Sequence, residues 1–332
     1  HLNPTAAEIA YYMIQKMPTD VITAQLVKRF QVSAEVAGQD IQDFKVRVET
    51  LMQTPDLDPE TFLDMERIDA YPEELSSPIR LDCALTYDTS DGNAERYAPI
   101  ERVKRPLDTE EWKAILNKAW EAGIPHVVFT GGEPTLRPDL SELIAYAESI
   151  GQVTGLITDG TRLTGKDYLR TLLTAGLDHL MIILDPSNEE CWEAIRDASS
   201  EDIFLNVHMT VNQKVFDTLP VLLTRLYAIG VRSLSLSSEH KSNKEQLLQA
   251  YQKATEFGFG LTYDLPVPYS AINPISLELE ESHERSTGSG RTWLYVEPDG
   301  DVLPGQGINH SIGNLLTDDW TTISANRKLK DM

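Results

Sequence analysis

Several carboxylate and histidine side chains each follow an apolar, β-rich run in the middle of the chain. They are Glu133, Asp159, Asp185, His208 and His240. Carboxylates and imidazoles that share a cavity can move protons, hold a metal ion or bind a cationic ligand. These residues are therefore the first candidates for a functional site, provided that the fold brings the ends of the runs together.

The order of the runs predicts such a fold. Runs typical of buried strands cover residues 79–87, 126–131, 153–158, 179–185, 203–210 and 232–238. Amphipathic segments typical of helices alternate with them at 108–122, 139–150, 165–175, 188–198, 215–229 and 243–257. Strands buried on both faces and joined by helices pair in parallel through right-handed crossovers. We therefore expect an α/β fold, a partial (β/α)6 barrel of the TIM type, whose strand ends share one rim.

Composition shifts divide the chain further. Helical periodicity over 5–17, 21–30 and 34–53 predicts a small helical, winged-helix-like domain at residues 1–55. An acidic, proline-containing linker at 56–77 follows it. The barrel is expected at 78–270, with 260–269 as a further edge strand, and a C-terminal β-hairpin extension at 271–332.

Three segments at the predicted strand ends resemble motifs of the radical S-adenosylmethionine (SAM) superfamily. Val127–Arg137 contains a GGEP sequence, Leu156–Thr161 resembles a T-N-G-T turn with Asp159 in place of Asn, and Met181–Asp185 resembles an S-L-D strand ending. In that family the GGEP segment binds the amino group of SAM. The resemblance spans residues 78 to 269 and implies cofactor-binding roles for Gly131, Gly132, Glu133, Pro134, Asp159 and Asp185.

The same resemblance points to a missing iron–sulfur cluster. The family carries a C-x3-C-x2-C motif after its first strand, and here those positions are Thr89, Asn93 and Arg96. A hydroxyl, a carboxamide and a permanent cation cannot replace cysteine thiolates, so no cluster is expected. Arg96 could instead fill the vacated space in an ion pair with Glu133, or bind the carboxylate of a ligand. Gly131 and Gly132 likewise allow two interpretations, a tight turn or a surviving pocket for SAM or a related ligand.

Both flanking regions resemble modules of peptide-modifying proteins. The helical segments from His1 to Met52 resemble a PqqD-like domain, the recognition element that grips the leader of a ribosomally made peptide. That family's short strands normally come first, so we expect residues ahead of His1 to supply them. Arg291–Pro304 resembles the hairpin that opens a SPASM or twitch extension, with Gly305 where an auxiliary-cluster cysteine often stands. Trp293 and Tyr295 alternate on this hairpin and are expected to pack rather than to stack on a ligand.

Charge and apolar runs limit the classes of partner. The net charge of -23 disfavours nucleic acid and anionic lipid. No run approaches the roughly 18 apolar residues of a membrane span, and no signal peptide opens the chain, so we expect a cytoplasmic protein. Cys83 and Cys191 lie in different predicted elements and are expected to be buried core residues. His208 and His240 are expected to be hydrogen-bonded rim residues rather than metal ligands with Glu239 or Asp185.

Together these features predict a peptide- or partner-binding pseudoenzyme whose barrel acts as a scaffold and could retain a weak SAM-type pocket. The first alternative is an enzyme that uses SAM or a related ligand by polar chemistry, with Glu133, Arg96 and His208 as catalytic groups. The second is a radical SAM peptide-modifying enzyme in peptide natural-product biosynthesis, which would need the cysteines that are replaced here.

Overall fold

The computed structural model describes residues 4–54, 75–238, 244–263, 265–273 and 288–328. The chain divides into two compact units, residues 1–70 and 71–332. Most of the predicted linker at 56–77, together with Glu239 and His240, lies outside the described residues. No described helix is long and apolar enough to cross a membrane.

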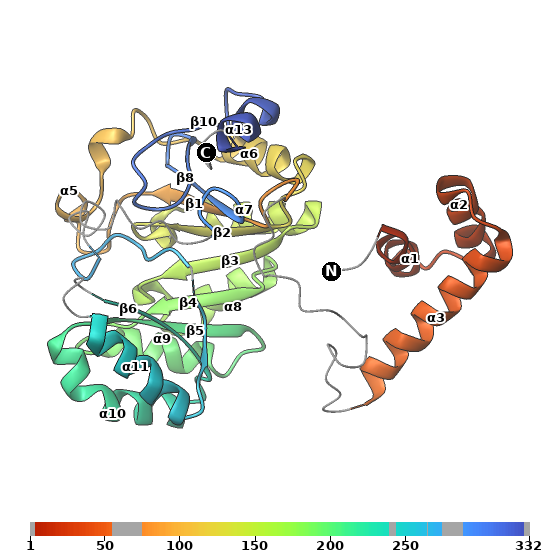
Figure 1. Ribbon diagram of the computed structural model, residues 1–332. Helices are drawn as coiled ribbons and strands as arrows, with labels where there is room; N and C mark the ends of the chain where they lie inside the picture. Colours follow the sequence, from red (N-terminus) through yellow and green to blue (C-terminus); the bar gives the residue numbers. More distant parts are fainter. Residues whose placement is uncertain (1–3, 55–74, 239–243, 264, 274–287, 329–332) are drawn as a thin grey trace. The chain divides into compact units, whose positions relative to one another are not determined.

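The first unit is a small bundle of three helices (Figure 1): α1 (Pro4–Ile14), α2 (Thr19–Phe30) and α3 (Ala34–Gln53). Ser33 begins α3 by accepting a hydrogen bond from the Val36 N–H at 3.2 Å, as expected of an N-cap serine. The core of this bundle is formed by Ile9 on α1 and by two apolar residues four apart on each of α2 and α3, namely Ile22, Leu26, Ala37 and Ile41.

The second unit is built on one curved sheet. Its strands are β1 (Arg80–Thr86), β2 (His126–Gly131), β3 (Val153–Thr158), β4 (His179–Ile183), β5 (Phe204–Val211), β6 (Ser233–Ser238) and β7 (Gly260–Leu261). Each pairs in parallel with the next along the chain, which is the predicted partial barrel. The expected edge strand at 260–269 is shorter than predicted, because only Gly260 and Leu261 pair with β6.

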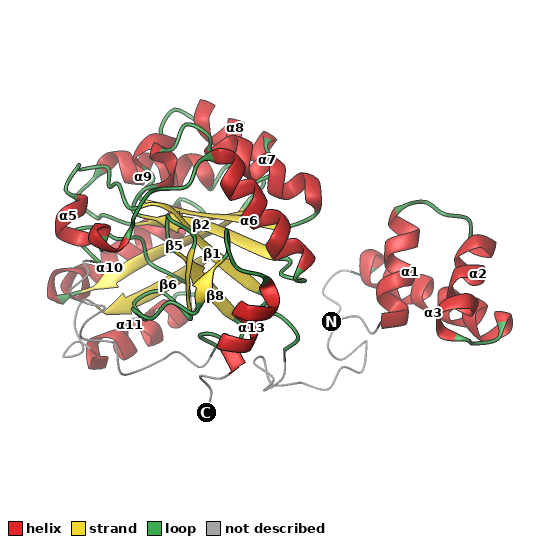
Figure 2. Ribbon diagram, turned by 90° about the horizontal axis from the view of Figure 1, so that it is seen from above, coloured by secondary structure: helices red, strands yellow, loops and turns green. Residues whose placement is uncertain are grey.

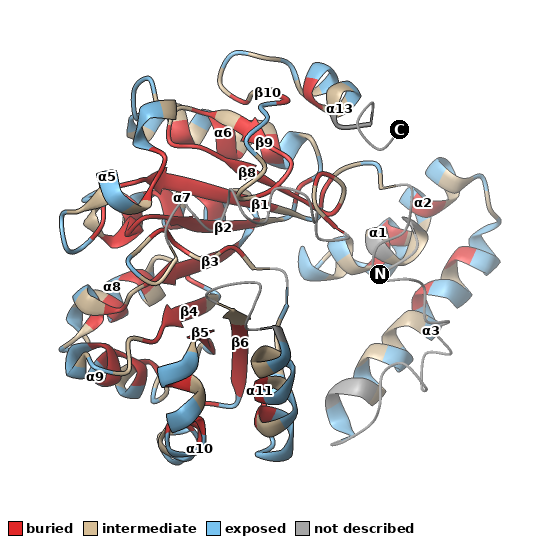
Figure 3. Cartoon of the chain, turned by 60° about the vertical axis from the view of Figure 1, so that its left-hand side comes forward, coloured by how far each residue is buried: buried red, intermediate tan, exposed pale blue. Residues whose placement is uncertain are grey.

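Helices cover the outer face of the sheet (Figure 2). They are α6 (Thr109–Glu121), α7 (Leu140–Ile150), α8 (Asp167–Thr174), α9 (Glu189–Ala198), α10 (Gln213–Ala228) and α11 (Lys244–Glu256). Their apolar stripes and the outward side chains of the strands form the main core. The strands are therefore largely buried, whereas the helices keep an exposed side (Figure 3).

The C-terminal hairpin extends the barrel sheet. Strand β8 (Trp293–Val296) pairs in parallel with β1, and β9 (Asp301–Leu303) returns antiparallel to β8. Strand β10 (Gly313–Asn314) pairs with β9, and helix α13 (Trp320–Lys328) follows. Trp293 and Tyr295 are both buried, so they pack against the inner side of the sheet as predicted.

Candidate functional site

The two glycines of the GGEP segment hold the end of β2 against the end of β1. A Cβ at Gly131 would lie 2.1 Å from the Thr86 carbonyl oxygen, and one at Gly132 would lie 2.2 Å from that of Asp88. Gly131 also has a φ of +124°, which side chains with a Cβ rarely adopt. The Gly132 N–H donates to the Thr86 oxygen at 2.8 Å. This close approach accounts for both glycines, so the tight-turn interpretation needs no ligand.

Glu133 is enclosed beside this turn, with 1% of its surface exposed. Its Oε1 accepts hydrogen bonds from the Thr135 N–H at 3.0 Å, the Thr135 hydroxyl at 2.6 Å and the Thr158 hydroxyl at 2.8 Å. Its Oε2 accepts from the Asp159 N–H at 2.8 Å. Burial is the largest cause that raises the pKa of Glu133, and the neighbouring Asp159 carboxylate is the second. Together they raise this pKa to about 8, although the hydrogen bonds act to lower it.

The other two predicted carboxylates lie on the turns after β3 and β4. Asp159 adjoins Glu133 and uses Oδ1 to accept from the Thr161 N–H at 2.8 Å. Asp185 accepts from the N–H and the hydroxyl of Ser187, at 2.9 Å and 2.6 Å. The fold thus brings Glu133, Pro134 and Asp159 together, while Asp185 caps its own turn.

The loop after β1 is organised by a carboxylate. Asp91 accepts from the Thr89 hydroxyl at 2.7 Å and from the Asn93 N–H at 3.0 Å. Burial opposes its ionisation, but the hydrogen bonds from Thr89 and Asn93 lower the pKa of Asp91. Thr89 is buried, whereas Arg96, in the short helix α5 (Ala94–Tyr97), is exposed. The ion pair between Arg96 and Glu133 that the sequence suggested does not occur among the described contacts, because Glu133 is satisfied by its threonine neighbours.

These residues do not fit an iron–sulfur cluster. The loop offers a hydroxyl, a carboxamide and a guanidinium, and the only two cysteines of the chain lie elsewhere. Cys83 is fully buried in the core on the outer face of β1, and burial raises the pKa of its thiol. Cys191 is buried in α9, where burial raises the pKa of its thiol to about 12. Neither thiol is therefore available as a thiolate ligand.

His208 lies inside the barrel rather than on its rim. It has 1% of its surface exposed, with Nδ1 3.0 Å from the Ser235 hydroxyl and Nε2 3.0 Å from the Ser237 hydroxyl. Burial lowers the pKa of His208 to about 4, so the ring is neutral at physiological pH. The alternative catalytic set of Glu133, Arg96 and His208 is thus dispersed over an enclosed turn, an exposed helix and a strand interior.

Gly305, the expected position of an auxiliary-cluster cysteine, is closely packed. A Cβ there would lie 2.7 Å from the Ser289 hydroxyl oxygen and 3.6 Å from the Trp293 indole nitrogen. A larger side chain at this position would therefore require the Ser289 hydroxyl to move.

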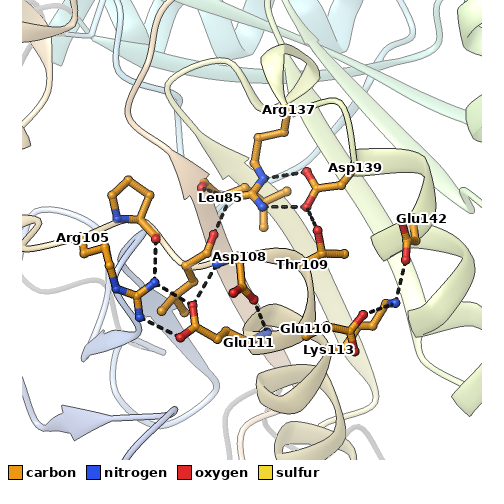
Figure 4. Close-up of polar contacts among 12 residues, drawn as sticks. Leu85, Arg105, Asp108, Thr109, Glu110, Glu111, Lys113, Arg137, Asp139 and Glu142 are labelled. Atoms are coloured by element: carbon orange, nitrogen blue, oxygen red, sulfur yellow. Dashed lines mark hydrogen bonds and ion pairs between the residues drawn. The ribbon is translucent and has the colours of Figure 1, made fainter.

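Sequence reasoning missed Arg137, whose hydrogen bonds hold the segment after GGEP in place (Figure 4). Its guanidinium binds the Asp139 carboxylate at 2.9 and 2.6 Å and donates to the carbonyl oxygens of Leu85 and Leu107 at 3.2 and 2.9 Å. Asp139 also accepts from the Thr109 hydroxyl at 2.7 Å, at the start of α6. The segment after GGEP is therefore tied to β1 and α6. An arginine three residues beyond the GGEP proline was the available signal.

Sequence reasoning also missed a histidine pair at the opposite ends of the strands. His126 begins β2 and His179 begins β4, and their Nε2 atoms are 2.5 Å apart. Gly155, between them on β3, leaves room for the His179 ring, because a Cβ there would lie 2.0 Å from it. Burial and the neighbouring His179 lower the pKa of His126 to about 3. Among the described residues no group of three or more metal-binding side chains is present.

Comparisons with known proteins agree with the geometry of the barrel. A family model described as the Radical SAM superfamily matches residues 82–225. A PqqA peptide cyclase of Bradyrhizobium diazoefficiens is 26% identical over 261 residues, which are 69% of this chain and 65% of that protein. One of Gluconobacter oxydans is 31% identical over 214 residues, 60% of this chain and 55% of that protein. The chain thus spans less than two thirds of the length of these relatives.

Two solved structures share the fold. Streptococcus suis SuiB bound to S-adenosylmethionine has a TM-score of 0.59 at 14% identity, covering 96% of this chain and 80% of that one. SuiB bound to its precursor peptide SuiA has a TM-score of 0.58 at 13% identity, covering 98% and 82%. The chain thus matches the Radical SAM superfamily model over residues 82–225 and is similar in sequence to PqqA peptide cyclases.

Proposed function

We propose that this chain, with its Radical SAM domain, binds a peptide and works without an iron–sulfur cluster. The donor set of the loop after β1 carries the proposal: Thr89 and Asn93 are hydrogen-bonded to Asp91, and Arg96 is exposed and cationic. No thiolate is within the loop, and both cysteines belong to the core. The barrel then serves as a scaffold, and the reductive cleavage of SAM is absent.

A weak pocket for SAM or a related amino-acid-like ligand is part of the proposal. The Gly131 carbonyl oxygen accepts from the Tyr269 N–H at 2.9 Å, and the Glu133 carboxylate is engaged by four donors. Asp159 is another carboxylate beside this turn, and it is only partly buried. We infer that Asp159 would bind the ligand's ammonium group, with an affinity in the range of about 10 µM to 1 mM that a few polar contacts support.

The helical unit is the proposed site of peptide recognition, as its resemblance to a PqqD-like domain implies. Helix α1 carries two large hydrophobic side chains on its surface, Tyr11 and Ile14, which are 59% and 76% exposed. Neighbouring exposed apolar groups of this size often mark a binding surface. The acidic charge of the chain favours a neutral or basic peptide, with binding that weakens as salt rises.

The second candidate function is a peptide-modifying enzyme. The similarity of the chain to relatives named PqqA peptide cyclase favours it. In such an enzyme the cluster would supply the radical chemistry, and the loop after β1 would have to hold it. The residues present there do not fit that role, so we place this function second.

Anaerobic reconstitution with iron and sulfide separates the two functions. The wild-type chain should take up no stoichiometric cluster and should not cleave SAM when a reductant is added. A variant with Thr89→Cys, Asn93→Cys and Arg96→Cys restores the thiolate spacing and is the matched control. One cluster per wild-type chain, with the visible absorbance of thiolate-bound iron, would overturn the proposal.

Peptide recognition is tested by fluorescence polarisation with labelled leader peptides from any precursor-peptide gene found beside this gene. The variants Tyr11→Ala and Ile14→Asp should weaken binding at least about tenfold, equivalent to about 1.4 kcal/mol. Val221→Asp, on the exposed face of α10, is the control and should bind like the wild type. Equal binding by all variants would remove α1 from the proposed surface.

A further inference from the structure

A short segment of the chain, residues 265–273, lies against the inner face of the barrel; we call it the strap. It follows β7 and is part of the light-blue trace after α11 in Figure 1. Leu265 and Val267 pack against a buried apolar cluster that the inward side chains of β2, β3 and β4 form, namely Val128, Ile157, Met181 and Ile183. The strap thus covers the interior wall beneath the GGEP turn.

Side-chain hydrogen bonds to its backbone hold the strap in place. The Val267 N–H donates to Oε1 of Gln306 at 2.9 Å, and Nε2 of Gln306 donates back to the Val267 carbonyl oxygen at 2.7 Å. Asn273 donates to the same carbonyl at 2.8 Å. One side-chain amide therefore satisfies both polar groups of Val267, as the backbone of a neighbouring strand would.

The far end of the strap reaches the candidate site. The Tyr269 N–H donates to the Gly131 carbonyl oxygen at 2.9 Å, and the Tyr269 ring contacts Tyr87 edge-on at 5.2 Å between centroids. Tyr269 is 1% exposed. Any molecule that bonds to the Gly131 carbonyl, or that fills the wall beneath it, must take the place of the strap.

The sequence of the strap favours an extended backbone, the conformation in which many peptides bind. Pro266 and Pro268 flank Val267, so neither neighbour has an N–H that needs a partner inside the barrel. Prolines also favour an extended backbone, and extended peptides bind through main-chain hydrogen bonds with alternate side chains in pockets. Leu265 and Val267 occupy such alternate positions in the apolar wall.

We propose that the inner face of β2, β3 and β4 is a groove for an extended, neutral peptide with an aliphatic residue between prolines, and that the strap is its resident intramolecular occupant. A peptide of this class binds when the strap leaves, and the strap keeps the groove closed until then. This goes beyond the proposed function, because it depends neither on the cluster nor on the helical unit.

The experiment uses the full chain and a fluorescein-labelled synthetic peptide, Leu-Pro-Val-Pro-Tyr-Ser-Ala-Ile-Asn, with the sequence of residues 265–273. Gln306→Ala removes the amide that holds Val267. Gln246→Ala is the matched control, since Gln246 bonds Gln213 on the outer helices. Val267→Asp in the chain is a second releasing variant, because it places a carboxylate against the apolar wall. Chymotryptic cleavage after Tyr269 reports whether the strap has opened.

We expect both releasing variants to be cleaved after Tyr269 and to bind the peptide at least about tenfold more tightly than the wild type and Gln246→Ala. The same peptide carrying Val267→Asp should not bind. Opening of the strap without peptide binding would overturn the proposal, and so would equal binding by wild type and released variants. If neither variant exposes Tyr269 to the protease, the strap is a fixed part of the core and the proposal also fails.

Discussion

The buried carboxyl of Glu133 should make the barrel less stable as the pH rises, and Glu133→Gln should remove that dependence. Burial and Asp159 raise its pKa from 4.5 to about 8, so the folded chain binds this proton more tightly than the unfolded chain. The favourable contribution is complete below the unfolded pKa of 4.5. It is lost as the pH rises to about 8, where the folded group also ionises.

Between pH 6.5 and 8 the comparison with Glu133→Gln isolates this group, because the histidines that still titrate in the unfolded chain near pH 6.5 contribute equally to both proteins. A single proton difference changes the free energy of unfolding by at most about 1.4 kcal/mol per pH unit, and Glu133 is half ionised by about pH 8, so the loss across that window is about 1.6 kcal/mol. The glutamine variant has no proton to lose. At the low-pH end of the window its free energy of unfolding is about 1–3 kcal/mol lower than that of the wild type, because the N–H group of the glutamine side chain faces a hydrogen-bond donor.

Urea unfolding followed by tryptophan fluorescence measures the stability of the second unit, to which Glu133 belongs. All of the tryptophans lie in the second unit, at positions 112, 120, 192, 293 and 320. The helical unit is therefore silent in this signal. Asp159→Asn is a useful companion, since it removes a charge that raises the Glu133 pKa and should reduce the slope. If wild type and Glu133→Gln lose stability in parallel between pH 6.5 and 8, Glu133 does not titrate in this range and the reasoning is wrong.

The remaining predictions concern the glycine turn, the buried histidine and the thiols. Gly132→Ala should lower the free energy of unfolding by about 2–4 kcal/mol, because a Cβ would strike the Asp88 oxygen, whereas Gly260→Ala, with 3.7 Å to its nearest neighbour, should stay within about 1 kcal/mol in the same urea assay. Wild type should lose up to about 3 kcal/mol more than His208→Gln between pH 6.5 and 4, since the unfolded imidazole takes up a proton that the folded one refuses; equal losses would contradict this. The native chain should show no thiol reactive to Ellman's reagent, and both cysteines should react together on unfolding.

The strands and helices of the barrel could be predicted because each is a continuous apolar or amphipathic run. The predicted strand at 126–131 coincides with β2, and that at 153–158 with β3. The pairing of β8 with β1 could not be predicted from the sequence, since more than 200 residues separate Arg80 from its partner Trp293. The strap escaped prediction because its prolines remove the periodicity by which an element is recognised.

The candidate site was predicted in part for a similar reason. Motif spacing placed Glu133 and Asp159 at neighbouring strand ends, and the fold brings them into contact. Spacing does not tell which way a side chain points. His208 faces the barrel interior because it alternates along β5 with Val207 and Met209, whose side chains lie in the main core on the outer face. Arg96 is directed by the turn that Asp91 organises, an interaction between nearby residues that no strand pattern contains.

In the part of the chain that the structure describes, the sheet ends in two very short strands, and this limits how these edges can associate with other copies of the chain. One edge is β10, Gly313–Asn314, and the other is β7, Gly260–Leu261. An edge strand offers unpaired N–H and C=O groups to another chain, and a longer edge templates more intermolecular hydrogen bonds. Two residues at each end provide little such template, and the net charge of -23 adds repulsion between molecules. Concentrated preparations should therefore resist the growth of intermolecular β-structure.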